Sequence, residues 1–365
     1  MIDPQLGAPD ALPLALTQLG YTSHFAVAFA NVAEPGDEPA RVLAVHRNRL
    51  VISTADGEHS ATLDATLRKA GALDRPATGD WVGVHSIGSD ALGVRALVPR
   101  RSAFIRGAAG QKTTPQVVAA NIDLVLVVTA LPGDFNERRL ERYLALAWES
   151  GAMPVIVLTK CDLVPDPTEF VTTARTVAPG VDVIMISANS DDGVSELQSL
   201  IPTAATIALL GSSGVGKSTL VNRLVGEEVM RTAEVDVDGR GRHTTTHREL
   251  RRLASGLLVI DTPGMRELQL WSADAGIEQV FDDIIALSLS CRFADCSHER
   301  EPGCAVLQAV QGGQLDKERL TSWRKLMRES ARTRREGDAV AISAERAKLR
   351  AMMRSVRELY RLKPK

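Results

Sequence analysis

Aromatic residues are scarce in this chain of 365 residues, of which Phe, Trp and Tyr together make up 4%. Few rings are available to stack on bases, so composition alone does not indicate a protein that binds single-stranded nucleic acid in this way. Long apolar runs are also missing: the best candidate, 122–130, is too short to cross a bilayer and contains Asp123. The N-terminus has no basic region followed by an apolar core. We therefore expect no secretory signal, no membrane contact and a cytoplasmic location.

Cysteine is rare as well, with four residues in the chain. Three of them lie close together, and His298 lies among them in the spacing Cys-x4-Cys-x-His-x5-Cys. Four sulfur and nitrogen ligands suit tetrahedral Zn²⁺, and a site with no open position is structural rather than catalytic. Disulfides fit less well because cytosolic thiols stay reduced, and unrelated buried cysteines are the remaining alternative. The predicted ligands of one structural zinc ion are Cys291, Cys296, His298 and Cys304.

Charge of one sign does not dominate the chain, whose formal net charge is −2. The distribution is nevertheless uneven. Residues 314–365 contain 16 Lys and Arg against 7 Asp and Glu, which leaves +9 for this segment and −11 for the remainder. Within it, 349–361 has apolar residues at helical spacing with arginines on the other faces. Such a basic helical tail favours contact with a phosphate backbone, and the alternative is a solvated helix packed on its own domain.

A glycine-rich loop follows the short apolar segment 206–210, which has the length of a buried strand. Its glycines allow backbone N–H groups to close around phosphate oxygens. Lys217 can reach the β- and γ-phosphates, Ser218 can bind Mg²⁺, and the helix that begins here points its positive dipole end at the anion. An ordinary strand–helix turn is the alternative, which the flanking strand and helix patterns disfavour. The predicted phosphate-binding residues are Gly211, Ser212, Ser213, Gly214, Val215, Gly216, Lys217, Ser218 and Thr219.

Two short motifs that follow apolar runs are typical of guanine recognition. In the run Thr-Lys-Cys-Asp at 159–162, Asp162 can accept from N1–H and the exocyclic amine of guanine, a donor pair that adenine lacks. Lys160 would lie along the base plane, and the backbone N–H of Ala188 would meet the guanine carbonyl. Thr159 stands where Asn is usual, and its shorter side chain predicts a weaker tie to the phosphate loop. The predicted base-binding residues are Thr159, Lys160, Cys161, Asp162, Ser187 and Ala188, with a small buried residue as the alternative for the cysteine.

Further motifs indicate a magnesium ion and a nucleotide-sensing switch. Asp261 ends the apolar run 257–260 and would hold Mg²⁺ through water, and the Gly264 N–H would sense the γ-phosphate. One of the threonines at 244–246 would close over Mg²⁺ while that phosphate is present. Met265 stands where many GTPases carry a water-orienting Gln; His243 is the nearby candidate for this task, and an exposed loop histidine is the alternative. The predicted magnesium ligands are Ser218, Thr245 and Asp261, and the predicted catalytic residues are His243 and Lys217.

These motifs occur in an unusual order, because the base-reading motifs precede the phosphate loop in the chain. Binding depends on where loops meet in space, so a sheet rejoined at another point can hold the same site. With Gly-Arg-His-Thr-Thr-Thr at 241–246 and the cysteine cluster that follows Asp261, this order resembles the bacterial small-ribosomal-subunit-dependent GTPase A family. The resemblance extends over roughly residues 40–330.

The resemblance implies both a fold and a function. It implies an N-terminal OB-fold, a central GTPase domain with permuted motifs and a C-terminal zinc domain. It also implies hydrolysis of GTP to GDP and phosphate in late maturation of the 30S ribosomal subunit. Binding to 16S rRNA, stimulation by the small subunit and a catalytic role for His243 follow from the same resemblance. We further expect the protein to be a monomer.

The patterns along the chain predict how a multidomain protein is divided. Runs such as 41–46 and 50–54 suit a small β-barrel, although they do not distinguish an RNA-binding OB-fold from a generic barrel. From 122 to 261, apolar runs alternate with helical stretches, as in an α/β P-loop domain with a mostly parallel sheet. We assign 1–40 to an N-terminal extension, 41–105 to the barrel, 99–114 to a basic linker, 115–280 to the GTPase domain, and 281–365 to a mostly α zinc-binding domain with a basic helical tail.

Two other functions are compatible with the motifs. The first is another P-loop NTPase that uses ATP, such as a kinase, although Asp162 and the motif at 187–188 argue for guanine. The second is a nucleotide-dependent RNA-binding scaffold with little turnover, which the missing Gln favours. Nucleotide competition tests the first alternative, and turnover with and without 30S subunits tests the second.

Overall fold

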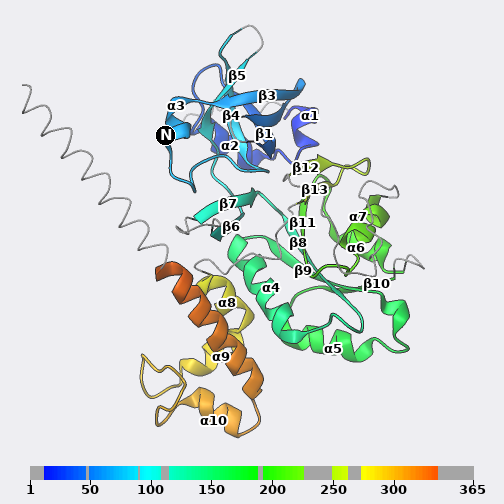
Figure 1. Cartoon of the computed structure of the whole chain (residues 1–365), viewed down its shortest axis with the longest axis vertical. Coiled ribbons are helices and arrows are strands. Elements are labelled where there is room, and N and C mark those ends of the chain that lie inside the picture. The colour runs from blue at the N-terminus through cyan, green and yellow to red at the C-terminus, as the bar shows by residue number, and fades with distance from the viewer. Residues whose placement is uncertain are drawn as a thin grey trace, which may run out of the picture.

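The computed structural model of the chain describes residues 12–46, 49–88, 91–107, 115–187, 192–225, 249–261 and 273–335. Figure 1 shows three units: a barrel from the N-terminal part, a central sheet flanked by helices, and a helical C-terminal unit. Within the described ranges, no helix is long and apolar enough to cross a membrane. The multidomain architecture predicted from the motifs is confirmed.

The N-terminal unit is a closed barrel whose strands pair in the order β1-β2-β3-β5-β4, with β4 pairing back to β1. The two runs expected to form barrel strands pair antiparallel, with Val45 opposite Leu50. Closure of five strands in this way leaves no free edge and is the arrangement of an OB-fold. The elements are β1 (Glu38–Val45), β2 (Leu50–Thr54), β3 (Gly57–Leu63), α3 (Ala65–Lys69), β4 (Trp81–Ser86) and β5 (Leu92–Leu97).

Two short helices precede the barrel, α1 (Leu14–Thr17) and α2 (Ser23–Ala30). Tyr21 and Phe25 are buried against Trp81, with ring centroids 4.6 and 6.0 Å from its ring. The segment before residue 41 therefore contains two helices and the start of β1, although its sequence shows only a weak pattern. Helices of four and eight residues are too short for a clear apolar period.

The central sheet has the strand order β10-β9-β8-β11-β13-β12. All of its neighbouring strands are parallel except β12, which is antiparallel to β13. The carboxyl ends of the parallel strands therefore meet at one edge, where open α/β sheets bind ligands. The strands are β8 (Leu124–Ala130), β9 (Met153–Thr159), β10 (Val183–Ile186), β11 (Thr206–Leu210), β12 (Glu249–Arg252) and β13 (Leu258–Asp261).

Helices cover both faces of this sheet, as the alternating pattern predicted. Successive residues of β8 enter different cores: Val125 and Val127 pack in the cluster that contains α4 and α5, and Leu126 packs in the cluster with α6 and α7. A strand buried on both faces has no polar alternation, which explains its continuous apolar run. The helices are α4 (Glu137–Ser150), α5 (Thr168–Val177), α6 (Val194–Leu200) and α7 (Lys217–Val225).

The barrel and the central sheet are joined through β1 and β12, where Ala44 pairs with Glu249. Arg41 on β1 is fully buried at this junction and donates to the carbonyl oxygen of Asn121 at 3.1 Å and to Thr206 Oγ1 at 3.2 Å. Burial lowers the pKa of Arg41 to about 10, so the guanidinium remains charged at neutral pH. These bonds tie the barrel to the start of β11.

Residues 99–107, the part of the predicted basic linker 99–114 that the structure describes, are more structured than expected. It contains β6 (Ala103–Gly107), which pairs antiparallel with β7 (Pro115–Ala120). Arg100 is not a solvated charge, because it pairs at 2.7 Å with the buried carboxylate of Asp80. The prediction of a plain basic linker is wrong here, since a buried carboxylate needs a partner that the local sequence does not reveal.

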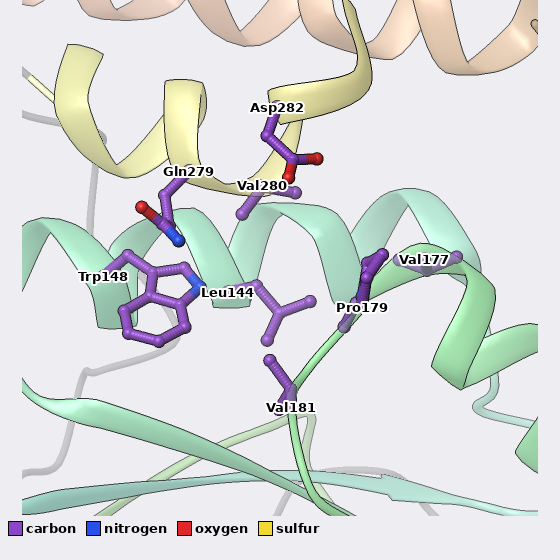
Figure 2. A pocket seen from close by; sticks show the side chains of 9 residues that line it. Leu144, Trp148, Val177, Pro179, Val181, Gln279, Val280 and Asp282 are labelled. Carbon is purple, nitrogen blue, oxygen red and sulfur yellow. The ribbon is translucent and has the colours of Figure 1, made fainter. Parts of the chain in front are cut away.

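The C-terminal unit packs on the central domain through α4. Gly276 allows α8 to approach α4 closely, because a Cβ at this position would lie 2.2 Å from the carbonyl oxygen of Ala145. A cavity of about 30 Å³ lies at this junction and is far too small for a nucleotide. Figure 2 shows Leu144, Trp148 and Val280 among the side chains that line it. The helices of the unit are α8 (Asp274–Val280), α9 (Asp282–Ser288), α10 (Ala305–Gln311) and a longer helix over 317–335.

Candidate nucleotide and metal sites

The phosphate loop joins β11 to α7 at the carboxyl edge of the sheet. Gly211, Gly214 and Gly216 have positive φ angles of 153°, 76° and 92°. A Cβ on Gly211 would lie 2.3 Å from the carbonyl oxygen of Val128, so only glycine fits between the loop and β8. Because α7 begins at Lys217, the loop ends at a helix N-terminus, whose N–H groups and positive dipole end favour an anion.

The Lys217 ammonium is held at the phosphate loop. Its Nζ donates to the carbonyl oxygens of Gly211 and Ser212 at 2.8 and 2.5 Å. These bonds keep a positive charge beside the backbone that was predicted to take the phosphates. The position agrees with the role predicted for this lysine.

The base-reading loop is tied to the phosphate loop by two hydrogen bonds. Thr159 ends β9, and its Oγ1 donates to the carbonyl oxygen of Val215 at 2.7 Å. Lys160 Nζ donates to the carbonyl oxygen of Gly214 at 2.9 Å. The threonine thus ties the two loops although its side chain is shorter than that of the usual asparagine. The end of β9 lies so near the loop that a Cβ on Gly216 would be 4.0 Å from the threonine hydroxyl, and a short side chain spans the gap.

The two base-reading motifs lie at neighbouring strand ends, because Ile186 of β10 pairs with Thr159 of β9. Asp162 lies in a single 3₁₀ turn, η1 (Cys161–Leu163), and is exposed, whereas Ser187 is buried just after β10. Lys160 has a φ of 57°, which turns the chain from the strand into η1. The thiol of Cys161 donates to the Leu158 carbonyl at 3.1 Å, and burial raises its pKa, as expected for a small packing residue.

Other predicted site residues are only partly visible. Asp261 is the last residue of β13, the strand beside β11, so its backbone lies at the same edge as the phosphate loop. This position agrees with a magnesium site there. Four residues predicted for the nucleotide site lie outside the described part of the chain: Ala188, His243, Thr245 and Gly264.

The predicted metal ligands form a compact cluster. The ligand atoms of Cys291, Cys296, His298 and Cys304 all lie within 4.8 Å of one another. The sulfurs of Cys291 and Cys304 are 3.8 Å apart, and His298 Nδ1 lies 3.5 and 3.4 Å from them. Tetrahedral bonds of about 2.3 Å to sulfur require sulfurs about 3.8 Å apart. The cysteines are free thiols, so this donor set fits a metal ion with four protein ligands.

The carboxylate of Glu301 stabilises the turn that carries the ligands Cys296 and His298. One oxygen of Glu301 accepts from the N–H of Ser297 at 3.0 Å and from its hydroxyl. The other accepts from the N–H groups of Glu299 and Arg300 at 2.8 and 2.9 Å. The Ser297 hydroxyl and these N–H groups lower the pKa of Glu301 to about 2, so the carboxylate stays charged. No motif includes Glu301, and the signal for it in the sequence is its position between the ligands His298 and Cys304.

The long C-terminal helix supports the same turn. Arg324 donates to the carbonyl oxygen of His298, and the imidazole centroid is 5.5 Å from the ring of Trp323. Burial lowers the pKa of His298, which favours the neutral imidazole that binds metal ions. The metal cluster is therefore packed directly on the helix at 317–335.

A parallel sheet with a phosphate loop at its carboxyl edge, tied to a base-reading loop that precedes it in the chain, defines a circularly permuted P-loop GTPase. Residues 97–271 match the family model described as RsgA GTPase. The chain is 44% identical over 362 residues to the small ribosomal subunit biogenesis GTPase RsgA of Opitutus terrae, covering 96% of this chain and 99% of that one. It is 46% identical over 331 residues to the protein of the same name from Streptomyces coelicolor, covering 90% of each. The chain belongs to the RsgA GTPase family and is a GTP hydrolase.

Two solved structures share the fold. YjeQ from Thermotoga maritima superposes with a TM-score of 0.61 at 23% identity, covering 81% of this chain and 99% of that one. YloQ, described as a circularly permuted GTPase, superposes with a TM-score of 0.57 at 24% identity, covering 81% of this chain and 95% of that one. At these identities the likeness establishes the common architecture.

Proposed function

We propose that this GTP hydrolase binds its nucleotide between the phosphate loop and the two base-reading motifs. The observation that carries the proposal is the pair of bonds from Thr159 and Lys160 to the phosphate loop. A nucleotide along this seam would place its phosphates at the N-terminus of α7 and its base at the ends of β9 and β10. The exposed carboxylate of Asp162 would accept from N1–H and the amine of guanine, with the N–H of Ala188 at the carbonyl.

The residues around the phosphates have distinct tasks in this site. Lys217 would exchange its carbonyl partners for phosphate oxygens. Ser218, Thr245 and Asp261 would hold Mg²⁺, which neutralises charge that builds up on the phosphates during transfer. His243 would orient the attacking water, since the thioether of Met265 cannot. Gly264 would sense the γ-phosphate through its N–H.

Nucleotide competition tests the base assignment. A fluorescent GDP analogue is bound to the full chain and displaced with GDP, GTP or ATP. We expect GDP and GTP to displace it at concentrations at least about a thousandfold below ATP, because adenine leaves the Asp162 carboxylate without donors. Equal displacement by ATP would overturn guanine recognition and favour another P-loop NTPase.

We also propose that the metal cluster binds one structural Zn²⁺ ion. Support comes from the donor set of three thiols and one imidazole, and from separations that match tetrahedral coordination. Zinc bound there would stabilise the turn between α9 and α10, with no position left for substrate. Metal analysis of the purified chain is expected to give about one zinc per protein.

The role in maturation of the 30S subunit is proposed from the relatives, which are named for small ribosomal subunit biogenesis. The partners would be the 30S subunit and its 16S rRNA, met by a monomer of this chain. Lys325, Arg328 and Arg332 support an RNA contact, because they are exposed on the helix at 317–335 and share one face at spacings of three and four.

Turnover of GTP measured against increasing purified 30S subunits tests this role. We expect the rate to rise by more than about tenfold, as ordering of a catalytic group lowers a barrier. A rate unchanged by 30S subunits would contradict the proposal. Binding to the subunit without any turnover would instead support the scaffold alternative.

A further inference from the structure

Arg139 contacts the phosphate loop although no motif includes it. Its Nη1 donates to Ser212 Oγ at 2.9 Å and to the carbonyl oxygen of Asp134 at 3.3 Å, and it pairs with the Asp134 carboxylate. The Arg139 N–H donates to the side chain of Asn136, the N-cap of α4, at 2.9 Å. Backbone and side chain of this arginine are therefore both fixed at the first turn of α4.

Arg139 and Thr159 together hold the phosphate loop at two points. The second oxygen of Asp134 accepts from Thr129 Oγ1 at 3.2 Å, which anchors the arginine's partner to β8. Arg139 thus holds the loop near its start at Ser212, and Thr159 holds it near its end at Val215. Because Lys217 donates to the carbonyl of Ser212, a shift of this serine would also move the ammonium.

The C-terminal unit binds the same helix, α4, through ion pairs and hydrogen bonds. Arg142 pairs with Glu329 through two bonds of 2.6 and 2.7 Å. Glu141 is fully buried and accepts from Ser322 Oγ and from Arg319 Nη1. Removing one partner from such a buried charged network is strongly destabilising. The first two turns of α4 therefore lie in a fixed position between the phosphate loop and the helix at 317–335.

We propose that Arg139 is a positioning residue for GTP hydrolysis, because its bond to Ser212 fixes the position of the phosphate loop. The helix at 317–335 in turn fixes the position of Arg139 through its contacts with α4. The inference rests on the nucleotide site proposed above. A shift of the C-terminal unit, whose predicted metal ligands pack on the same helix, would therefore be transmitted through α4 to the phosphate loop. Any displacement of that helix by a partner changes how firmly the loop is held.

A double-mutant cycle tests the contact itself. Arg139→Ala and Ser212→Ala are each expected to raise the Kd for GDP about three- to tenfold, with a matching fall in kcat/KM for GTP, because each removes one charge-assisted hydrogen bond. The double variant is expected to be no weaker than Arg139→Ala alone, since both substitutions remove one contact. Arg139→Lys keeps a single donor and is expected to lie in between. Arg175→Ala, an exposed arginine on α5, is the matched control and should equal wild type.

Two outcomes would overturn the role proposed for the bond between Arg139 and Ser212. Additive effects of the two substitutions would show that they act separately. A lower unfolding temperature for Arg139→Ala with unchanged Kd and kcat/KM would reduce the arginine to a structural role. Lys217→Ala separates the two proposals: if it binds GDP like wild type, the nucleotide site itself fails. If it loses GDP while Arg139→Ala equals wild type, only the present inference fails.

The contact between α4 and the helix at 317–335 is tested by substituting Glu329. Glu329→Ala is expected to raise the Kd for GDP about two- to fivefold in the wild-type background and to add nothing in the Arg139→Ala background. Lys317→Ala, at an exposed position of the same helix, is the matched control and should leave GDP binding unchanged. An unchanged Kd in Glu329→Ala, or an equal effect in both backgrounds, would overturn the part assigned to the helix at 317–335.

Discussion

The Thr159 hydroxyl donates a hydrogen bond of 2.7 Å to the carbonyl oxygen of Val215 and so joins the loop proposed to read the base to the loop proposed to hold the phosphates. Thr159 is 6% exposed, so the bond lies out of water. A buried acceptor that loses its donor costs about 1–3 kcal/mol, much more than a hydrogen bond at the surface. We therefore expect the geometry of the proposed nucleotide site to depend on Thr159, which departs from the usual asparagine.

Replacing Thr159 tests this dependence directly. Thr159→Val keeps the shape of the side chain and removes the hydroxyl, so the Val215 carbonyl loses its donor. We expect the Kd for GDP to rise by about fivefold or more, measured by titration calorimetry. Thr159→Asn, which restores an amide donor, is the control and should bind close to wild type. A valine variant with unchanged Kd would show that the bond does not support nucleotide binding.

The base preference is expected to depend on Asp162. Asp162→Asn replaces two acceptors by one acceptor and one donor, so GTP binding should weaken by roughly 2–4 kcal/mol. Xanthine nucleotide should bind better to the variant than to wild type, because its additional carbonyl can accept from the new amide. Competition between GDP and XDP measures both effects. Unchanged affinity for GTP would remove Asp162 from the site.

The metal cluster should be separable from the nucleotide site. Cys296→Ser is expected to release the metal and to unfold the segment around the cluster, since ligand binding supplies much of the folding energy of so small a unit. GDP should still bind, because the central domain has its own core. Metal analysis and GDP titration of the same preparation check both statements. About one zinc per variant chain would contradict the ligand assignment.

Stimulation by the small subunit is expected to require His243. If 30S binding places this histidine at the attacking water, His243→Ala should keep GTP and 30S affinity and lose most of the stimulated rate. The slow rate without 30S should change little, because the histidine is not positioned there. Turnover of wild type and variant is compared with and without purified subunits. A fully stimulated variant would assign the missing group to the ribosome.

The barrel should show a defined loss of stability in acid. Burial alone would raise the pKa of Asp37, but the bond from Arg95 at 2.6 Å and the N–H of Glu34 outweigh it and hold the pKa below its ordinary value of 3.8. The resulting stabilisation is present above 3.8 and is lost as the pH falls through the lower folded-state value. We expect Asp37→Asn to be less stable than wild type at neutral pH, and the difference in unfolding temperature to shrink below about pH 4. A difference that stays constant with pH would refute this.

Local patterns predicted the elements that build the site. The apolar run at 206–210, expected to be a buried strand, has the bounds of β11. The glycines before Lys217, the run at 159–162 and the cysteine cluster lie where strand ends and turns were expected. Each of these signals depends on residues that are neighbours in sequence, so the chain carries them without reference to the rest of the fold.

Elements with weak local signals were not predicted. Short α2 and the turn before it bury Phe25 and Tyr21 against Trp81, a contact that their own periodicity does not reveal. Arg100 was expected in a solvated linker, and its partner Asp80 lies 20 positions earlier. In both cases a contact with another part of the chain outweighs the local preference.

The sequence by itself determined that this chain is a permuted GTPase with a cluster of candidate metal ligands, because those motifs are contiguous and their order along the chain is read directly. The tertiary structure alone decided what holds the phosphate loop. Thr159 and Val215 are separated by 56 positions, and Arg139 and Ser212 by 73. A hydrogen bond depends on distances of a few tenths of an ångström between groups that folding brings together. No spacing in the sequence specifies that distance, and the packing of β9 and α4 beside the loop does.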